Sequence, residues 1–205
     1  MSKIPVGILG ATGAVGQKFV SLLSSHPWFE VRELAASEQS SGKPYCEVVS
    51  WKQTKPIPEV IGDLVIKECR PGLDCKIVFS GLDSSVAGEV EKDFASAGYW
   101  VFSNAKNHRM GSDIPLVIAE LNSEHLDIIP QQQKNRGWEG AIVTNANCSA
   151  IVLALSIGPL HQSFGLEAVN VVTLQAISGA GYPGVPSWDI LGNVVPFISG
   201  EEEKI

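Results

Sequence analysis

The sequence is poor in cysteine and lacks the cysteine spacing of a metal site. Its 205 residues include four cysteines, Cys46, Cys69, Cys75 and Cys148, and none of them forms a CxxC pair. Cys69 and Cys75 also have no histidine nearby, so no metal site is predicted. The first predicted strand begins almost at Met1, which leaves no room for a cleavable targeting segment. We therefore expect reduced thiols and a cytoplasmic protein.

Positive charge and long apolar runs are also scarce. The net charge is -7 at pH 7 and the isoelectric point lies near 5.1, which argues against nucleic-acid or anionic-membrane partners. The longest apolar run, Ala150 to Leu160, is too short to cross a bilayer. A hydrophobic content of 44% is enough for the core of a soluble globular protein. The length allows one full domain and part of a second.

The sequence does contain a regular alternation of strand and helix patterns. This alternation predicts an α/β fold with a doubly wound, mostly parallel, Rossmann-like sheet. Ser84 is the predicted N-cap of one helix, and Gly98 ends that helix. Strands are predicted at 3–9, 29–36, 64–68, 76–80, 99–103 and 141–144, and helices at 15–25, 84–97 and 149–160.

Three further segments do not fit the alternation. Residues 42–55 are expected to form an irregular or antiparallel excursion, 130–140 a polar surface loop, and 166–177 a β-rich run. We place a nucleotide-binding domain at 1–147 and the start of an α+β catalytic or dimerisation domain at 148–205.

The end of the sequence resembles the start of a helix. Ser199 to Ile205 contain a cap and an acidic first turn, and a one-turn helix has little stability of its own. We therefore expect residues 148–205 to be an incomplete domain, from a fragment, an abbreviated isoform or an incomplete gene model. A frayed natural tail is the alternative. An incomplete domain would expose apolar residues such as 169–174 and favour aggregation.

A glycine loop follows the first predicted strand. Gly10, Gly13 and Gly16 give the pattern GxxGxxG. Glycine lets the backbone turn tightly and approach a phosphate, and the helix N-terminus that follows offers unpaired N–H groups. The same residues also serve ordinary strand–helix turns, but the position at the first strand–helix junction favours a dinucleotide site.

The residues after the second strand bear on the choice between NAD and NADP. NAD sites usually carry an acidic residue there for the ribose hydroxyls. Here Ser37, Ser40, Ser41 and Lys43 follow the strand, and hydroxyls with a lysine suit a 2′-phosphate. Glu38 is the counter-argument, although it falls just past the strand. The pattern favours NADP.

Cys148 lies between an apolar strand and an apolar helix, in the sequence Asn-Ala-Asn-Cys-Ser-Ala. A helix N-terminus stabilises the thiolate, which is the nucleophilic form. Asn147, or the backbone N–H groups beside it, could stabilise an oxyanion. A buried cysteine at a helix start is more often a packing residue, so the position alone leaves both roles open.

Further polar residues follow predicted strands. Gln175 ends a β-rich run and could orient a substrate, or it could be a rim residue. Arg109, or else Lys106, could bind a phosphate or carboxylate. Ser80 and Asn104, at the ends of two strands, are candidates for contact with the cofactor.

Several motifs occur together in one order: GATGAVG, SNAKNHRM, NANCSA, LQAISGAGYPG and GEEEK. In this order they resemble the aspartate-β-semialdehyde dehydrogenases of archaea and fungi, over essentially the whole sequence. The resemblance implies reduction of L-aspartyl-4-phosphate to L-aspartate 4-semialdehyde with NADP as cofactor, in the synthesis of lysine, threonine, methionine and isoleucine. It also implies a homodimer or homotetramer.

The resemblance assigns roles residue by residue. Cys148 matches the nucleophile and Gln175 the substrate-orienting glutamine. Arg109 matches a phosphate-binding arginine, and Glu201 and Lys204 match a pair that contacts the substrate amino group and phosphate. The matches to cofactor contacts are Thr12, Gly13, Ala14, Val15, Ser37, Ser40, Ser178 and Gly179. In the family a further arginine and an acid–base histidine lie downstream of this pair, where this sequence has no residues, so efficient turnover is not expected.

Two other interpretations stay open. N-acetyl-glutamyl-phosphate reductase uses the same thioester chemistry, although QAISGAGYPG resembles the semialdehyde enzyme better. A non-catalytic NADP-binding derivative of the family would retain cofactor binding without reduction.

Overall fold

The computed structural model describes residues 2–180 and 184–205, and the chain divides into two compact units. Unit 1 comprises Met1–Val117 and Ser123–Asn145, and unit 2 comprises Ile118–Asn122 and Ala146–Ile205. In the described part of the chain, no helix combines the length and apolar character needed to cross a membrane.

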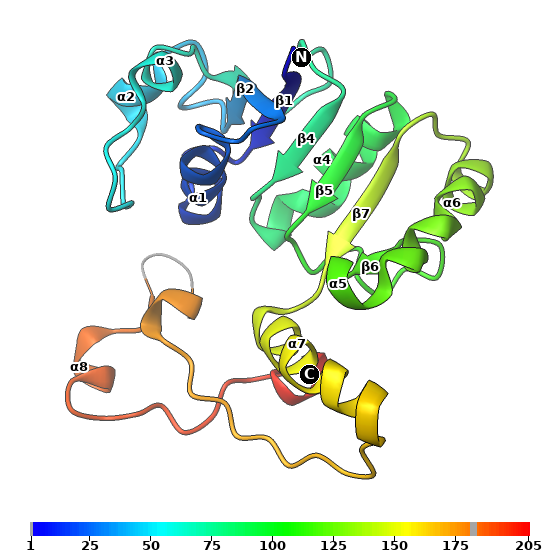
Figure 1. Ribbon diagram of the computed structural model, residues 1–205. Helices are drawn as coiled ribbons and strands as arrows, with labels where there is room; N and C mark the ends of the chain where they lie inside the picture. The colour runs from blue at the N-terminus through cyan, green and yellow to red at the C-terminus, as the bar shows by residue number, and fades with distance from the viewer. Residues whose placement is uncertain (1, 181–183) are drawn as a thin grey trace. The chain divides into compact units, whose positions relative to one another are not determined.

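Unit 1 is built on a parallel sheet (Figure 1). The strand order is β3-β2-β1-β4-β5-β7-β6, and every neighbouring pair is parallel. This order confirms the predicted doubly wound fold. The strands are β1 (Ile4–Leu9), β2 (Phe29–Ala36), β3 (Lys67–Glu68), β4 (Ile77–Ser80), β5 (Trp100–Ser103), β6 (Leu116–Val117) and β7 (Ala141–Asn145).

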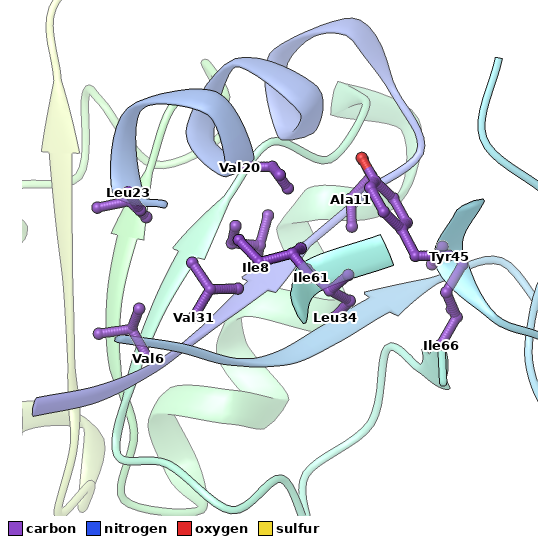
Figure 2. Close-up of a cluster of buried hydrophobic side chains, with 11 residues drawn as sticks. Val6, Ile8, Ala11, Val20, Leu23, Val31, Leu34, Tyr45, Ile61 and Ile66 are labelled. Carbon is purple, nitrogen blue, oxygen red and sulfur yellow. The ribbon is translucent and has the colours of Figure 1, made fainter. Parts of the chain in front are cut away.

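Alternate residues of each strand pack into cores on opposite faces of the sheet, because side chains point to the two faces in turn. Val6 and Ile8 of β1 belong to a core with Val20 of helix α1 (Ala14–Leu23), and Figure 2 shows these side chains together. Leu9 belongs to a second core with Phe94 of α4 (Ser84–Ser96). The two helices therefore cover opposite faces, as a doubly wound sheet requires.

The excursion predicted at 42–55 is confirmed. It contains a single helical turn, α2 (Tyr45–Val48), and an antiparallel bridge joins Pro44 to Val65. The next short helix is α3 (Glu59–Gly62). The strand predicted at 64–68 is shorter than expected, since only β3 pairs in the sheet.

The N-cap predicted for α4 is wrong by one residue. Asp83, not Ser84, is the cap, and its side chain accepts a hydrogen bond of 2.9 Å from the backbone N–H of Ser85. Both residue types cap well, so the sequence alone did not distinguish them. Gly98 follows the helix with a φ of 86°, as expected for a helix end.

We therefore expect Asp83→Ala to lower the melting temperature measurably, because the N–H of Ser85 loses its capping acceptor. Ser84→Ala is the matched control and should leave stability nearly unchanged, since its side chain has no capping role. Thermal melts of both variants check the assignment. Equal losses in the two variants would contradict it.

The surface loop predicted at 130–140 is wrong. Helix α6 (Ile129–Arg136) occupies most of this segment and ends at Gly137, whose φ is 65°. Pro130 lies in the first turn, where a missing N–H costs nothing. Arg136 donates to both carboxylate oxygens of Asp113, and this tertiary pairing holds a helix whose sequence is too polar to show an apolar stripe. The turns α5 (Ala119–Asn122) and η1 (Ser123–Ile128), and strand β6, were not predicted.

Unit 2 is mainly one helix, α7 (Cys148–Phe164), which packs against α5. The β-rich run predicted at 166–177 is wrong, because residues 165–176 form no strand in the structure as described. A strand needs neighbours to pair with, and Val172 and Leu174 are both 90% exposed here. The remaining elements are η2 (Ile177–Ala180), α8 (Ser187–Ile190) and η3 (Glu202–Lys204).

Candidate functional site

The glycine loop lies where the strand order of unit 1 reverses. From β1 the chain runs to β2 on one side, and later returns to β4 on the other side of β1. Leu9 and Ser80, the last residues of β1 and β4, are partners in register, so Gly10 and Gly81 follow side by side. Such a switch point at the carboxyl ends of parallel strands is where doubly wound sheets bind ligands.

Three glycines are required for the backbone packing at this point. Gly10 has a φ of 72°, which favours glycine. A Cβ at Gly16 would lie 2.1 Å from the carbonyl oxygen of Gly10, and a Cβ at Gly81 would lie 2.8 Å from the nitrogen of Gly16. Sequence reasoning missed Gly81, although a glycine directly after a predicted strand was a usable signal.

Gly13 is different, because the fold itself does not require it. Its φ is -74°, and a Cβ there would meet only the carbonyl oxygen of Gly10, at 3.4 Å. Gly13, Ala14 and Val15 are exposed at the start of α1, where the first-turn N–H groups have no acceptor within the helix. The loop therefore offers open backbone that fits a dinucleotide pyrophosphate, while Thr12 is half-buried beside it.

The turn after β2 carries the predicted 2′-phosphate residues. Ser37 and Lys43 are exposed and Ser40 is half-buried. The Glu38 carboxylate, the counter-argument to NADP, lies 3.3 Å from the guanidinium of Arg70. Arg70, which sequence reasoning missed, also pairs with Glu68 at 2.8 Å and lines a hollow of about 420 Å³ with Ser41. Glu38 is therefore already paired within the protein.

The loop after β5 is tied together by polar contacts. The Asn104 carbonyl oxygen accepts a hydrogen bond of 2.9 Å from Arg109, and its side-chain oxygen accepts one of 2.8 Å from Asn145. Both Asn104 and Arg109 are half-buried, so they border the carboxyl edge of the sheet. Ser80, in contrast, is completely buried. A contact between the cofactor and Ser80 stays a prediction.

A buried carboxyl and imidazole lie beneath this loop. Glu91 of α4 is fully buried, and its Oε1 accepts a hydrogen bond of 2.8 Å from Ser103. Its Oε2 lies 3.5 Å from Nε2 of His108. Burial raises the pKa of Glu91 and lowers the pKa of His108, and the charges around His108 are Lys92, Arg136 and Glu89. Both directions favour uncharged partners.

Because the pKa of Glu91 is raised, its contribution to the free energy of unfolding changes with pH in a known direction. The folded state binds this proton more tightly than the unfolded state, so the contribution of Glu91 is full at low pH and is lost as the pH rises through the folded pKa. The lowered pKa of His108 changes stability with pH in the opposite direction, but His108 is present in both the unsubstituted chain and the Glu91→Gln variant. We expect the melting temperature of Glu91→Gln, relative to that of the unsubstituted chain, to rise by a few degrees as the pH increases above the ordinary glutamate pKa. Melts of both proteins across this pH range check it, and a difference independent of pH would contradict it.

In unit 2, Cys148 is the first residue of helix α7, as predicted, and it is exposed. Asn147 caps the helix: its side-chain oxygen accepts hydrogen bonds from the N–H groups of Ser149 and Ala150, at 2.9 and 3.3 Å. Those two N–H groups are therefore engaged by the cap. If the Asn147 side chain stabilises an oxyanion, as predicted, its amide nitrogen must be the donor. Cys46 is also exposed, but it lies in the four-residue helix α2.

A cavity of about 1010 Å³ within unit 2 brings together several predicted residues. Asn147, Cys148, Gln175 and Glu201 line it among apolar side chains. Gln175 donates a hydrogen bond of 2.7 Å to Oε1 of Glu201, and the hydroxyl of Ser149 lies 3.2 Å from the same oxygen. Sequence reasoning missed Ser149. Glu201 is only 8% exposed, so an amide and a hydroxyl orient a buried carboxyl group that lines the same cavity as the thiol.

The remaining predicted residues are placed in part. Ser178 and Gly179 lie in η2, and a Cβ at Gly179 would be 3.5 Å from the side-chain oxygen of Gln175. Gly181, Tyr182 and Pro183 of the predicted glycine-rich motif are outside the described residues. The backbone of Lys204 ends η3, and its side chain is outside the described part of the chain.

Comparison with known families assigns both parts of the sequence. The family profile described as semialdehyde dehydrogenase, NAD binding domain, matches residues 5–129. The profile described as semialdehyde dehydrogenase, dimerisation domain, matches residues 157–205.

Two curated relatives with similar sequences carry the same name. The aspartate-semialdehyde dehydrogenase of Archaeoglobus fulgidus is 54% identical over 201 residues, covering 98% of this chain and 58% of the relative. That of Schizosaccharomyces pombe is 52% identical, covering 98% of this chain and 57% of the relative. The chain thus spans less than two thirds of the length of these curated relatives.

Solved structures agree with the sequences. The crystal structure of aspartate semialdehyde dehydrogenase with NADP from Candida albicans has a TM-score of 0.86 and 46% identity, covering 99% of this chain and 58% of that one. An aspartate semialdehyde dehydrogenase II from Vibrio cholerae has a TM-score of 0.69 and 28% identity, covering 89% and 49%. The predicted resemblance is confirmed, and the chain belongs to the semialdehyde dehydrogenase family, among relatives named aspartate-semialdehyde dehydrogenase.

Proposed function

We propose that this protein takes part in the NADP-dependent reductive dephosphorylation of L-aspartyl-4-phosphate to L-aspartate 4-semialdehyde. The observation that carries the proposal is the cavity of unit 2, where a helix-terminal thiol, an amide and an oriented carboxylate line one space. The product is a precursor of lysine, threonine, methionine and isoleucine. The relatives named above support the choice of reaction.

The thiolate of Cys148 attacks the carbonyl carbon of the acyl phosphate. A carbon–sulfur bond forms, the carbon–oxygen bond to phosphate breaks, and inorganic phosphate leaves with the electron pair. Addition of hydride to the carbonyl carbon of the resulting thioester would give a tetrahedral alkoxide. Its collapse breaks the carbon–sulfur bond, releases the aldehyde and regenerates the Cys148 thiolate, with no net proton required. The α7 N-terminus stabilises the thiolate as nucleophile and again as leaving group.

NADPH supplies the hydride when it is bound. The N–H groups of Ala14 and Val15, in the first turn of α1 beside the open surface at Gly13, would hold its pyrophosphate. The turn containing Ser37 and Ser40 would hold its 2′-phosphate. The NAD-binding family profile supports this site, and the relative solved with NADP supports the choice of NADP.

We assign a different group of the substrate to each of several polar or charged side chains. The Glu201 carboxylate, oriented by Gln175 and Ser149, suits the substrate ammonium group. Arg109 suits a phosphate because a guanidinium can bind it with two parallel hydrogen bonds, and Lys204 is proposed as a second phosphate contact. Gln175 orients the reacting carbonyl.

Oligomerisation and location complete the proposal. The dimerisation-domain profile over residues 157–205 supports assembly into a homodimer or homotetramer. Unit 2 exposes large apolar side chains that such an assembly would cover, among them Val172, Leu174 and Trp188. We place the protein in the cytoplasm, where its unpaired thiols stay reduced.

The test is the reverse reaction of the 205-residue chain. Aspartate semialdehyde, NADP⁺ and phosphate are mixed, and NADPH is followed by absorbance while intact mass reports acylation of the protein. We expect an aspartyl adduct and NADPH formation that depend on both the aldehyde and NADP⁺. A folded chain that binds NADPH but forms neither product would favour a non-catalytic derivative.

Substrate preference separates the remaining alternative. N-acetyl-glutamate semialdehyde replaces aspartate semialdehyde in the same assay. Its chain is longer by one carbon and its nitrogen is acetylated and uncharged, so it cannot pair with the Glu201 carboxylate. We expect little reaction, and a preference for this aldehyde would identify the N-acetyl-glutamyl-phosphate reductase reaction.

A further inference from the structure

Five consecutive carbonyl oxygens of the glycine loop, from Leu9 to Gly13, each accept an internal hydrogen bond. Backbone N–H groups supply three of these bonds. Gly81 donates to Leu9 at 2.9 Å, Gly13 to Gly10 at 3.0 Å, and Gln17 to Gly13 at 2.9 Å.

Buried side chains supply the other two bonds. The hydroxyl of Tyr45 donates to the carbonyl oxygen of Ala11, and Nε2 of Gln17 donates to that of Thr12, both at 2.9 Å. Tyr45 is fully buried and Gln17 is 2% exposed. Figure 2 shows the Tyr45 hydroxyl turned toward Ala11.

Both side chains connect the loop to one segment, residues 42–52. Tyr45 belongs to this segment and packs edge-on against Trp51, with ring centroids 6.3 Å apart. Gln17 reaches it through two more hydrogen bonds: its Nε2 donates to the carbonyl oxygen of Ser50 at 3.1 Å, and its Oε1 accepts from the N–H of Lys52 at 2.7 Å. The amide of Gln17 thus joins three backbone groups.

These bonds matter for an anion because carbonyl oxygens repel phosphate while N–H groups attract it. A carbonyl oxygen that already accepts an internal bond stays turned into the protein, and the peptide N–H groups keep a fixed direction. We propose that Gln17 and Tyr45 are positioning residues for the dinucleotide pyrophosphate. The inference rests on the NADP site of the proposed function and adds residues that do not touch the cofactor.

The test compares two ligands on two variants. Tyr45→Phe removes the hydroxyl donor, and Gln17→Met removes the whole amide, including the Oε1 that accepts from Lys52; both nearly keep the side-chain volumes. Binding of NADPH is measured by fluorescence titration, and adenosine 2′-monophosphate, which has no pyrophosphate, is measured by calorimetry. We expect each variant to weaken NADPH binding about tenfold, the effect of losing the one hydrogen bond that each side chain donates to the glycine loop. Affinity for adenosine 2′-monophosphate should stay within about twofold.

Unit 1 offers a matched control for each variant. Gln132 is also buried and joins three backbone groups, through hydrogen bonds to Asp113 and Ile142. The hydroxyl of Tyr99 likewise donates to a backbone carbonyl oxygen, that of Leu73, and it also accepts a hydrogen bond from the N–H of Gly72. Gln132→Met and Tyr99→Phe should lower the melting temperature comparably and leave the NADPH affinity of the folded protein unchanged.

The outcomes separate this inference from the proposed function. If the unsubstituted chain binds NADPH but Gln17→Met and Tyr45→Phe bind it equally well, the positioning role is overturned and the NADP site stands. Equal weakening of NADPH and adenosine 2′-monophosphate, or equal weakening in the control variants, would also overturn it. If the unsubstituted, folded chain binds no NADPH, the proposed function and this inference both fail.

Discussion

Replacement of Cys148 by serine is expected to abolish the aspartyl adduct and to lower the rate of NADPH formation from aspartate semialdehyde at least about a thousandfold. A serine hydroxyl does not ionise near neutral pH, and the helix N-terminus that stabilises a thiolate cannot make the hydroxyl an equivalent nucleophile. NADPH affinity should not change, because Cys148 is not among the residues that we assign to the cofactor. Intact mass and absorbance measure the chemical steps, and fluorescence titration measures binding.

Cys46→Ser is the matched control, since Cys46 is the other exposed cysteine among the described residues. It should retain the adduct and the rate of the unsubstituted chain. Full activity in Cys148→Ser, or loss of activity in Cys46→Ser alone, would refute the assignment of the nucleophile.

Replacement of Gly16 by alanine is expected to lower the free energy of unfolding by more than about 3 kcal/mol. Its Cβ would lie 2.1 Å from the carbonyl oxygen of Gly10 and 2.7 Å from the Cα of Ala11. Both contacts are with backbone, so no side-chain rotation relieves them, and α1 must move away from β1. Denaturant unfolding monitored by circular dichroism measures the loss.

Gly13→Ala tests whether a residue of the same loop can affect NADPH binding without affecting the stability of the fold. The added Cβ would meet only the carbonyl oxygen of Gly10, at 3.4 Å, so stability should change by less than about 1 kcal/mol. The methyl group would stand on the exposed backbone that we assign to the pyrophosphate, and we expect NADPH binding to weaken at least about tenfold. Similar stability losses at Gly13 and Gly16 would contradict the distinction.

The sheet was predictable because its strands are buried and locally encoded. β2 has the predicted bounds, and β1, β4 and β5 differ from the prediction by one residue. The failures depend on distant contacts. Helix α6 is held by the pairing of Arg136 with Asp113, 23 residues apart, and no pattern within 130–140 reports this pairing. The apolar pattern of 166–177 indicates a strand, but pairing also requires partners.

The candidate site was predictable where one short motif carries the chemistry. The glycine loop and Cys148 follow from strand–helix junctions. Gln17 and Tyr45 did not, because their role depends on hydrogen bonds to carbonyl oxygens of the loop that no local pattern specifies. The convergence of Ser149 and Gln175 on Glu201 spans up to 52 residues, so only the fold reveals it.

Unit 2 takes the five residues Ile118–Asn122 from within the sequence of unit 1. These residues form α5, and Leu121 lies so close to α7 that a Cβ at Gly158 would be 2.8 Å from it. The two units therefore do not correspond to two continuous stretches of the gene. Recombination that replaced everything after Asn145 with the sequence of a relative would pack a new α7 against the original Leu121. We therefore expect substitutions in α5 and α7 to occur together.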